Sequence, residues 1–206
     1  MSPHALLALL LQYPDSEILD ARDDIVAAVH ESHSSLRDDQ ALSEFLSWWV
    51  ATSEYQLQSA YVDTFDLGRR CALHVTYALF GDRRERGMAL LRLKARYAAH
   101  GFALSDAELP DFLPVMLEYA AADADGDALL SEHRVPLELL RAALHEGHSP
   151  YEAVVAAACS LLGVLTEEER AQARQIAAEG PPMETVGLEP FAPPDIMPEM
   201  SGDLRR

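Results

Sequence analysis

The stretch ELPDFLPVMLEYAA, residues 108–121, gives the sharpest structural signal in the chain. Its two prolines, Pro110 and Pro114, are separated by one helical turn and lie between acidic residues and an apolar run. Proline is tolerated in the first turn of a helix, where its missing amide hydrogen would have no partner. With Asp111 at or near the N-cap, Pro114 falls in that first turn. The stretch is therefore either a sharply defined start of a core helix or a surface held rigid for a partner.

Helical periodicity extends outward from this stretch over most of the chain. Apolar side chains recur at positions i, i+3, i+4 and i+7, which is the spacing of one face of a helix. Pro136 interrupts a further apolar run, residues 129–144, and predicts a break or kink near Val135. The periodic positions are Leu42, Phe45, Leu46, Trp49 and Val50, then Leu57, Ala60, Tyr61, Thr64 and Phe65, and then Tyr151, Val154, Val155, Ala158 and Leu162.

Residues 73–80, LHVTYALF, are ambiguous, because apolar residues alternate there with period two, as in a strand. A lone strand leaves its backbone groups unpaired, and the sequence offers no second strand candidate. We therefore predict a helix over this segment. Capping boxes predict further helix starts, at Asp82 with Glu85, Ser149 with Glu152, and Thr166 with Glu169.

These signals together predict the all-α fold class, with a single helical domain of about nine or ten helices over residues 1–179. From residue 180 onward the helical pattern ends. Six of the 12 prolines lie between Pro181 and Pro198, with acidic residues interspersed. Such a composition cannot build a core, so we expect residues 180–206 to form a disordered tail.

The charge balance excludes several kinds of partner. Among 206 residues, Lys and Arg number 16 and Asp and Glu number 34, so the formal net charge is −18. Such a charge repels phosphate backbones, and we expect no nucleic acid partner. No segment reaches the roughly 20 apolar residues that span a bilayer, and the N-terminus lacks the features of a secretory signal. We expect a cytoplasmic protein with no direct membrane insertion.

Motifs of catalysis and metal binding are missing from the sequence. It carries no phosphate-binding loop, dinucleotide-binding motif or GxSxG elbow. Cys71 and Cys159 lack the spacing of zinc ligands or of a CxxC redox pair, and we expect buried, reduced thiols. We predict no metal site and no enzymatic activity. The enzymatic alternative is His74 as an acid/base residue, although a histidine in an apolar segment more often belongs to the core.

Positive charge is concentrated in one part of the chain. Residues 69–96 hold half of the Lys and Arg residues and two acidic ones, so their net charge is +6 and that of the remainder is −18 − 6 = −24. One explanation is a basic helix that forms salt bridges with acidic neighbours. The other is a basic strip on the surface that binds an anionic ligand or an acidic partner. The strip comprises Arg69, Arg70, Arg83, Arg84, Arg86, Arg92, Lys94 and Arg96.

The run YVDTFDLGRRCALHVTYALFGDRRERGMALLRLKARYAAHGF, residues 61–102, followed by ELPDFLPVMLEYAA, resembles the respiratory nitrate reductase assembly chaperones. These are the NarJ-type delta subunits of the TorD/DmsD family of molybdoenzyme maturation proteins. The resemblance covers residues 3–165 and implies an all-helical cytoplasmic chaperone. Such a chaperone binds the N-terminal segment of the catalytic alpha subunit of nitrate reductase until the molybdenum cofactor is inserted and membrane docking is safe.

The resemblance also bears on cofactors and partners. It implies that the molybdenum cofactor is inserted into the client and is not stably bound by the chaperone, and that cofactor-delivery proteins are further partners. The client could also be another molybdoenzyme of the superfamily. An all-helical ligand-sensing regulator is an alternative from a different class, but Arg22 and Arg37 are the only Arg or Lys residues among residues 1–60, too few for a DNA-recognition helix.

Candidate site residues are those that match the family pattern. Its glutamate-x-proline-aspartate pattern corresponds to Glu108, Pro110 and Asp111, followed by Pro114 and Glu118, and its tyrosine-phenylalanine helix ending corresponds to Tyr61, Phe65 and Asp66. A basic amphipathic client helix would lay its apolar face on exposed apolar residues and be attracted by nearby carboxylates. The apolar residues that we nominate are Tyr61, Phe65, Tyr77, Leu117 and Tyr119, and the carboxylates are Asp66, Asp111 and Glu118.

Overall fold

The computed structural model describes residues 1–32, 36, 38–68, 70–105 and 108–179. Within these ranges the chain is all α, as predicted, and contains twelve α-helices, one π-helical turn (η1) and no β-strand. This exceeds the predicted nine or ten helices, because short helices such as α2 and α6 leave little periodic signal. The predicted tail, residues 180–206, lies outside the described residues.

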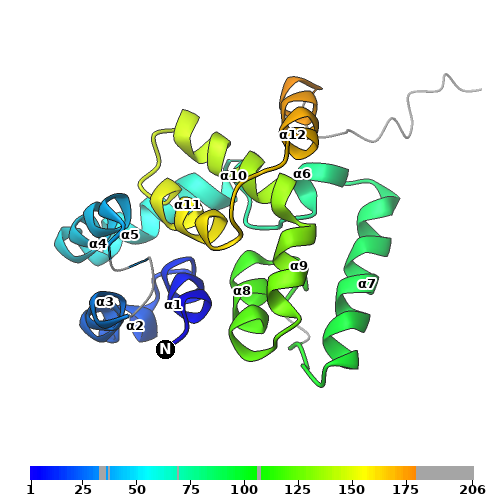
Figure 1. Cartoon of the computed structure of the whole chain (residues 1–206). Helices are drawn as coiled ribbons and strands as arrows, with labels where there is room; N and C mark the ends of the chain where they lie inside the picture. Colours follow the sequence, from blue (N-terminus) through cyan, green and yellow to red (C-terminus); the bar gives the residue numbers. More distant parts are fainter. Residues whose placement is uncertain (33–35, 37, 69, 106–107, 180–206) are drawn as a thin grey trace, which may run out of the picture.

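The elements follow one another along the chain as Figure 1 labels them. They are α1 (Pro3–Leu10), α2 (Ser16–Asp20), α3 (Arg22–Glu31), α4 (Gln40–Ala51), α5 (Glu54–Tyr61), η1 (Val62–Asp66), α6 (Tyr77–Phe80), α7 (Arg84–Ala99), α8 (Leu113–Ala122), α9 (Gly126–Glu132), α10 (Arg134–Glu146), α11 (Glu152–Leu161) and α12 (Glu167–Glu179).

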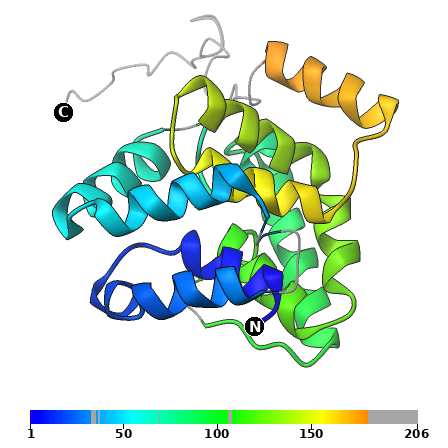
Figure 2. The same cartoon turned by 60° about the vertical axis from the view of Figure 1, so that its left-hand side comes forward.

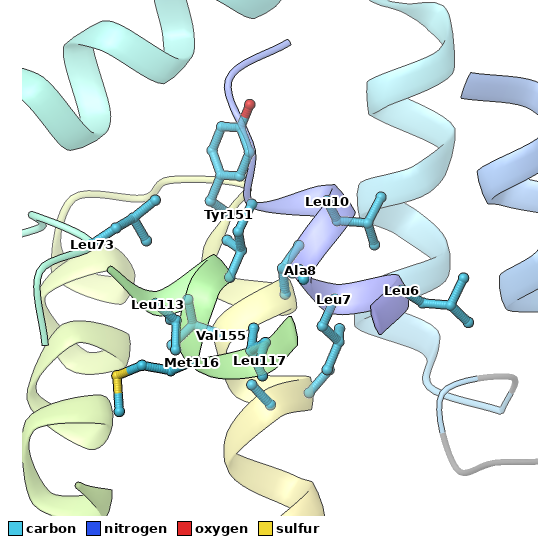
Figure 3. Close-up of a cluster of buried hydrophobic side chains, with 14 of the residues drawn as sticks. Leu6, Leu7, Ala8, Leu10, Leu73, Leu113, Met116, Leu117, Tyr151 and Val155 are labelled. Carbon is cyan, nitrogen blue, oxygen red and sulfur yellow. The ribbon is translucent and has the colours of Figure 1, made fainter. Parts of the chain in front are cut away.

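Helix α1 belongs to the core because nearly all of its side chains are apolar. Leu6, Leu7 and Leu10 are buried, and Figure 3 shows side chains of α1 beside those of α8 and α11. A helix that is hydrophobic on all sides must be covered on all sides. Its start is capped by Ser2, whose Oγ accepts a hydrogen bond from the amide of Ala5 at 3.2 Å. The main core therefore forms where α1 packs against α8 and α11.

An aromatic cluster extends this core toward α4, α5 and η1. The ring centroids of Tyr61 and Phe65 lie 4.8 Å apart, and that of Tyr151 lies 4.9 Å from Phe65, both in edge-to-face orientation. Phe45 of α4 lies 5.4 Å from Tyr151. The hydroxyl of Tyr61 donates a hydrogen bond to the carbonyl of Leu11 at 3.1 Å, which satisfies its polar end inside the core.

Helix α8 begins one residue before Pro114, so this proline occupies the first turn as predicted. The N-cap is Phe112 and makes no side-chain cap hydrogen bond. Asp111 lies next to the N-cap, within the predicted range, but its carboxylate is fully buried and bonds to side chains from other segments instead of the first turn of α8. Six residues of α8 are buried, which makes it a core helix.

Helices α8 and α9 approach each other closely at a glycine. A Cβ atom on Gly126 would lie 2.1 Å from the Cα of Ala120, so a larger residue would force the two helices apart. The apolar run of residues 129–144 is divided as predicted, and the break falls at His133. Pro136 then lies in the first turn of α10, where its missing amide hydrogen is not needed.

The predicted helix over residues 73–80 is wrong for its first half, since α6 covers only the second half. His74 instead forms an isolated antiparallel β-bridge with Phe112. The backbone partner missing from the sequence analysis is thus the turn before α8, which has no strand-like pattern of its own. The bridge is closed by two backbone hydrogen bonds of 2.9 Å, from the amide of Val75 to the carbonyl of Asp111 and from the amide of Leu113 to the carbonyl of Leu73.

Of the three predicted capping boxes, the one at Thr166 is confirmed. Its amide donates to the Glu169 carboxylate at 2.7 Å, and the Glu169 amide donates to the Thr166 hydroxyl at 3.2 Å. Helix α7 begins after Arg83 with no side-chain cap. Helix α11 begins at Glu152, because Ser149 forms a turn in which its carbonyl accepts the Glu152 amide at 3.0 Å.

Helices α7 and α12 lie at the periphery. Figure 1 shows α7 along one edge of the molecule and α12 beyond α10, and Figure 2 again shows α12 on the outside. Helix α7 buries Leu93 and Tyr97, and residues 167–178 of α12 include none that is buried. Among the described helices, none combines the length and apolar character required to cross a membrane.

Candidate peptide-binding site

An apolar hollow of about 50 Å³ lies between residues 70–78, α10 and α12. Arg70 and His74 contribute its polar groups, and the remaining lining is largely apolar. The hollow is therefore suited to apolar side chains, and two helices, α10 and α12, contribute to its walls. The other lining residues are Ala72, Val75, Tyr77 and Ala78, then Pro136, Leu139, Leu140 and Ala143 of α10, and Ile176 and Ala177 of α12.

Asp111 is linked to this hollow through His74 and is fully buried. The Thr76 hydroxyl donates to its Oδ2 at 2.5 Å, the Arg86 guanidinium donates to the same oxygen at 3.3 Å, and His74 Nδ1 lies 3.3 Å from Oδ1. A buried carboxylate is stable only when it is paired and hydrogen-bonded. Asp111 therefore joins the entry of α8 to α7 and to the segment before α6.

Opposing effects set the pKa of Asp111. Burial alone would raise it, because removal from water disfavours the ionised form. The hydrogen bonds from His74 and Thr76 and the positive charge of Arg86 outweigh burial, and the pKa lies below its ordinary value. The carboxylate is therefore ionised at neutral pH.

Tyr77 connects this ionic group to the hollow. Its ring lines the hollow, and the guanidinium carbon of Arg86 lies 5.6 Å from the ring centroid, a cation–π contact. Arg86 thus contacts the Asp111 carboxylate and the Tyr77 ring at once. The position of Tyr77 in the wall is fixed by the same residue that neutralises the buried charge.

The structure separates the five nominated apolar residues into two groups. Tyr77 lines the hollow, whereas Tyr61, Phe65, Leu117 and Tyr119 are buried. The prediction that these four are exposed is wrong. Helical periodicity shows that a face is apolar, but it does not distinguish a face covered by the chain's own helices from one left for a partner.

The nominated carboxylates do not line the hollow. Asp111 is buried, Asp66 and Glu108 are exposed, and Glu118 is half-buried. The Glu118 carboxylate accepts a hydrogen bond from Gln12 at 2.9 Å. Burial and the nearby charge of Glu108 raise the pKa of Glu118, and the Gln12 hydrogen bond lowers it by less. The hydrogen bond thus links Glu118 of α8 to Gln12, which lies just after the end of α1.

Pro110 and Pro114 are both buried. The carbonyl of Pro110 accepts a hydrogen bond from the hydroxyl of Tyr97 at 2.8 Å, which ties the entry of α8 to α7. The two prolines therefore stiffen a backbone that positions Asp111. Of the two interpretations of this stretch, the structure shows the core helix start.

The basic strip divides into two groups. Arg83, Arg84, Arg92 and Lys94 are exposed and form no ion pair with a described residue. Arg69 lies outside the described residues. Salt bridges with acidic neighbours therefore explain only the paired group. These pairs are Arg70–Glu146 at 2.9 Å, Arg86–Asp111 at 3.3 Å, Arg96–Asp125 at 2.6 Å and Arg96–Glu132 at 2.8 Å.

The residues of α10 and α12 that line the hollow were not predicted from the sequence. Leu139, Leu140 and Ala143 belong to an apolar run, but the sequence does not show which segment they oppose. A signal was present in α12, where Ile176 is the only large aliphatic residue among residues 167–179. An isolated aliphatic residue in a charged helix indicates a single point of docking.

The described residues contain no group of His, Cys, Asp and Glu side chains arranged to hold a metal ion. Both cysteines are free, with Cys159 buried and Cys71 half-buried, so the prediction of a buried thiol is wrong for Cys71. Burial raises the pKa of Cys159 to about 12, which keeps its thiol protonated and unreactive.

Comparisons with family models and with known proteins point to the same family. The chain matches the family described as nitrate reductase delta subunit over residues 30–157. It is 39% identical over 119 residues to the probable nitrate reductase molybdenum cofactor assembly chaperone NarJ of Bacillus subtilis (strain 168), a match that covers 56% of this chain and 62% of that protein. It is 33% identical over 149 residues to the nitrate reductase molybdenum cofactor assembly chaperone NarJ of Escherichia coli (strain K12), which covers 71% and 63%.

A third relative is larger. The nitrate reductase-like protein NarX of Mycobacterium tuberculosis (strain H37Rv) is 38% identical over 154 residues, which is 74% of this chain and 23% of NarX. The chain thus spans less than two thirds of each of these three relatives. The family match covers more than half of the chain and includes Asp111 with its three partners and the α10 wall of the hollow. The chain therefore belongs to the nitrate reductase delta subunit family.

Proposed function

We propose that this chain is a cytoplasmic assembly chaperone that binds the catalytic alpha subunit of nitrate reductase through its N-terminal segment. Binding precedes insertion of the molybdenum cofactor into the client and docking of the complex at the membrane. Membership of the delta subunit family supports this, as do relatives that are named nitrate reductase molybdenum cofactor assembly chaperones. The role is one of holding and release and requires no catalysis by this chain.

The observation that carries the binding mode is the apolar hollow with helices in its walls. Ile176 and Ala177 of α12 and four residues of α10 line it, so helical side chains already form part of its surface. An amphipathic client helix makes the same kind of contact when its apolar residues enter a groove. We assign the first contact to one or two apolar client side chains between Tyr77, Leu139 and Leu140.

The charge of the chain acts on the approach of the client more than on binding inside the hollow. The net charge of −18 attracts a basic segment from a distance and raises its association rate. At the hollow itself the polar lining groups are Arg70 and His74, which do not attract a cation. We therefore propose that client arginines contact exposed carboxylates outside the hollow, namely Asp66, Glu108 and Glu146.

Calorimetry tests this binding mode. The N-terminal peptide of the catalytic subunit is titrated into the full chain at two salt concentrations, beside a peptide in which its arginines are replaced. We expect binding that weakens with salt and is weaker for the replaced peptide. Leu139→Glu should lower the affinity by about tenfold or more, because it places a charge in the apolar wall.

Tyr55→Glu is the matched control, since Tyr55 is 79% exposed on α5 and should tolerate the charge with unchanged affinity. Absence of heat from the native peptide would overturn the proposal. Equal affinity of Leu139→Glu and wild type would move the site away from the hollow. In cells that lack the chain, fully metallated and active nitrate reductase would contradict the chaperone role itself.

A further inference from the structure

The outward face of α7 carries two apolar side chains that the described part of the chain leaves exposed. Met88 and Leu91 are 53% and 61% exposed, and the exposed residues Arg84 and Ala95 precede and follow them on the same face. These four positions follow one another at intervals of four, three and four residues. That alternation is the spacing with which one helix presents a seam to another. We call Arg84, Met88, Leu91 and Ala95 the α7 seam.

The opposite face of α7 holds the helix in place. Leu93 and Tyr97 are buried, and the Arg96 guanidinium donates to both carboxylate oxygens of Asp125, at 2.6 and 2.9 Å. Arg86 is bound to the buried Asp111 near the other end. Because the inner face supplies these anchoring contacts, the α7 seam is presented on a helix held from its other side.

Cations flank the α7 seam on both sides. Arg92 follows Leu91 and Lys94 precedes Ala95, which are the two positions beside a seam from which charged residues select a partner helix. Both are exposed and form no ion pair with the described part of the chain. Glu85 is the one acidic residue next to the seam. The flanks are therefore free to bind carboxylates.

We infer that the α7 seam docks an acidic amphipathic helix of a partner protein, at a site separate from the hollow. Apolar side chains of that helix cover Met88 and Leu91, and carboxylates beside them pair with Arg92 and Lys94. A basic client segment is repelled here, so the hollow and the α7 seam bind different partners. A second copy of the chain would place the cations of Arg84, Arg92 and Lys94 against each other.

Photo-crosslinking in cells tests this inference on the full chain. A benzophenone amino acid replaces Met88 in one variant and Tyr55, on α5, in the control variant, and cross-linked peptides are identified by mass spectrometry. We expect an adduct at position 88 whose partner segment is helical, with apolar residues at seam spacing flanked by Asp or Glu. An adduct yield no higher than at position 55 would overturn the inference. Adducts only with a second copy, with nucleic acid or with the basic client segment would do so as well.

Charge reversal gives the second measurement. Arg92→Glu with Lys94→Glu should lower the adduct yield at position 88 by about tenfold or more, because like charges then face each other across the interface. The matched control is Arg83→Glu with Arg174→Glu, which changes the net charge equally at two exposed positions off the seam and should leave the yield within about twofold. Equal losses in both variants would show a general charge effect and overturn the inference.

The same charge-reversed variant separates this inference from the proposed function. Circular dichroism should show an unchanged helical fold, since neither residue contributes to the core. Its affinity for the N-terminal peptide of the catalytic subunit should stay within about twofold of wild type if the two surfaces are separate. A loss of peptide affinity as large as that of Leu139→Glu would merge the two surfaces and overturn the inference.

Discussion

Helices α7 and α8 are neighbours in the chain and differ in what their side chains do. Helix α8 buries six residues, and α7, although longer, buries two. The stretch that leads into α8 has the more distinctive sequence, and its prolines and Asp111 all lie inside the fold. The exposed cations and apolar side chains belong to α7 instead. A distinctive motif can thus mark a segment of the interior and not an exposed surface.

The largest loss of stability should come from truncating a buried side chain of α8. Leu117 is fully buried in the core beside α1, as Figure 3 shows, so Leu117→Ala should lower the free energy of unfolding by about 2–5 kcal/mol. Urea denaturation followed by circular dichroism measures this change. A loss below about 1 kcal/mol would mean that α8 is not the core helix described here.

A slightly smaller loss of stability is expected from removing the ion pair between Arg86 of α7 and Asp111 before α8. Asp111→Asn leaves Arg86 without its buried counter-charge and should cost about 3 kcal/mol at neutral pH. Because the pKa of Asp111 is lower in the folded chain than its unfolded value near 3.9, its contribution is present above about pH 4 and is lost as the pH falls through the folded pKa.

The pH dependence separates this role from a loss of packing. The difference in free energy of unfolding between wild type and Asp111→Asn should shrink over the acidic range below about pH 4, as the pH falls through the folded pKa of Asp111. Asp66→Asn, at an exposed position, is the control and should show little difference at any pH in this range. A difference for Asp111→Asn that remains constant on acidification would contradict an ionic tie.

Arg96→Met should have a more local effect. The Arg96 hydrogen bond is the main reason that the pKa of Asp125 lies well below its ordinary value. Losing this forked contact should free the last turn of α7 from the turn between α8 and α9, with a smaller loss of global stability than Asp111→Asn. Hydrogen exchange should show faster exchange in that turn while α8 keeps its protection. Equal loosening of α8 would indicate that the two helices form one cooperative unit.

The smallest effect belongs to the outward face of α7. Leu91→Ala should change the free energy of unfolding by less than about 0.5 kcal/mol, because the side chain is 61% exposed. Leu91→Ala and Leu117→Ala are the same substitution in two adjacent helices, and urea denaturation measures both. Similar losses of stability for the two variants would contradict the distinction between a core helix, α8, and a helix with an exposed outer face, α7.

The sequence was sufficient for the fold class and for much of α8. Periodicity identified the amphipathic helices. Proline chemistry placed Pro114 in a first turn and predicted a break near Pro136, because both signals are local. The bridge of His74 with Phe112 was beyond such reasoning, since it pairs segments far apart in the chain. A pattern of period two indicates a strand only when its partner can also be recognised.

The candidate site was less predictable than the fold. Tyr77 lines the hollow, but Leu117 and Tyr119 are buried, because apolar periodicity looks the same for a core face and a docking face. The hollow is formed by side chains of three separate segments, and its composition follows from packing and not from any one motif. The charge of residues 69–96 did indicate an unusually basic segment, and the structure shows which of its described cations form no ion pair with another described residue.

The backbone bridge before α8 has a consequence for how freely the chain can change in length. The bridge joins residue 74 to residue 112, so the segment between them, which holds α6 and α7, is an excursion closed at its base. The entropic free-energy cost of closing such an excursion rises by only about 0.6 kcal/mol for each doubling of its length. An insertion at Asp82, in the exposed turn before α7, would therefore hardly weaken the bundle. The turn before α7 can thus change in length while the buried contacts of α7 stay as they are.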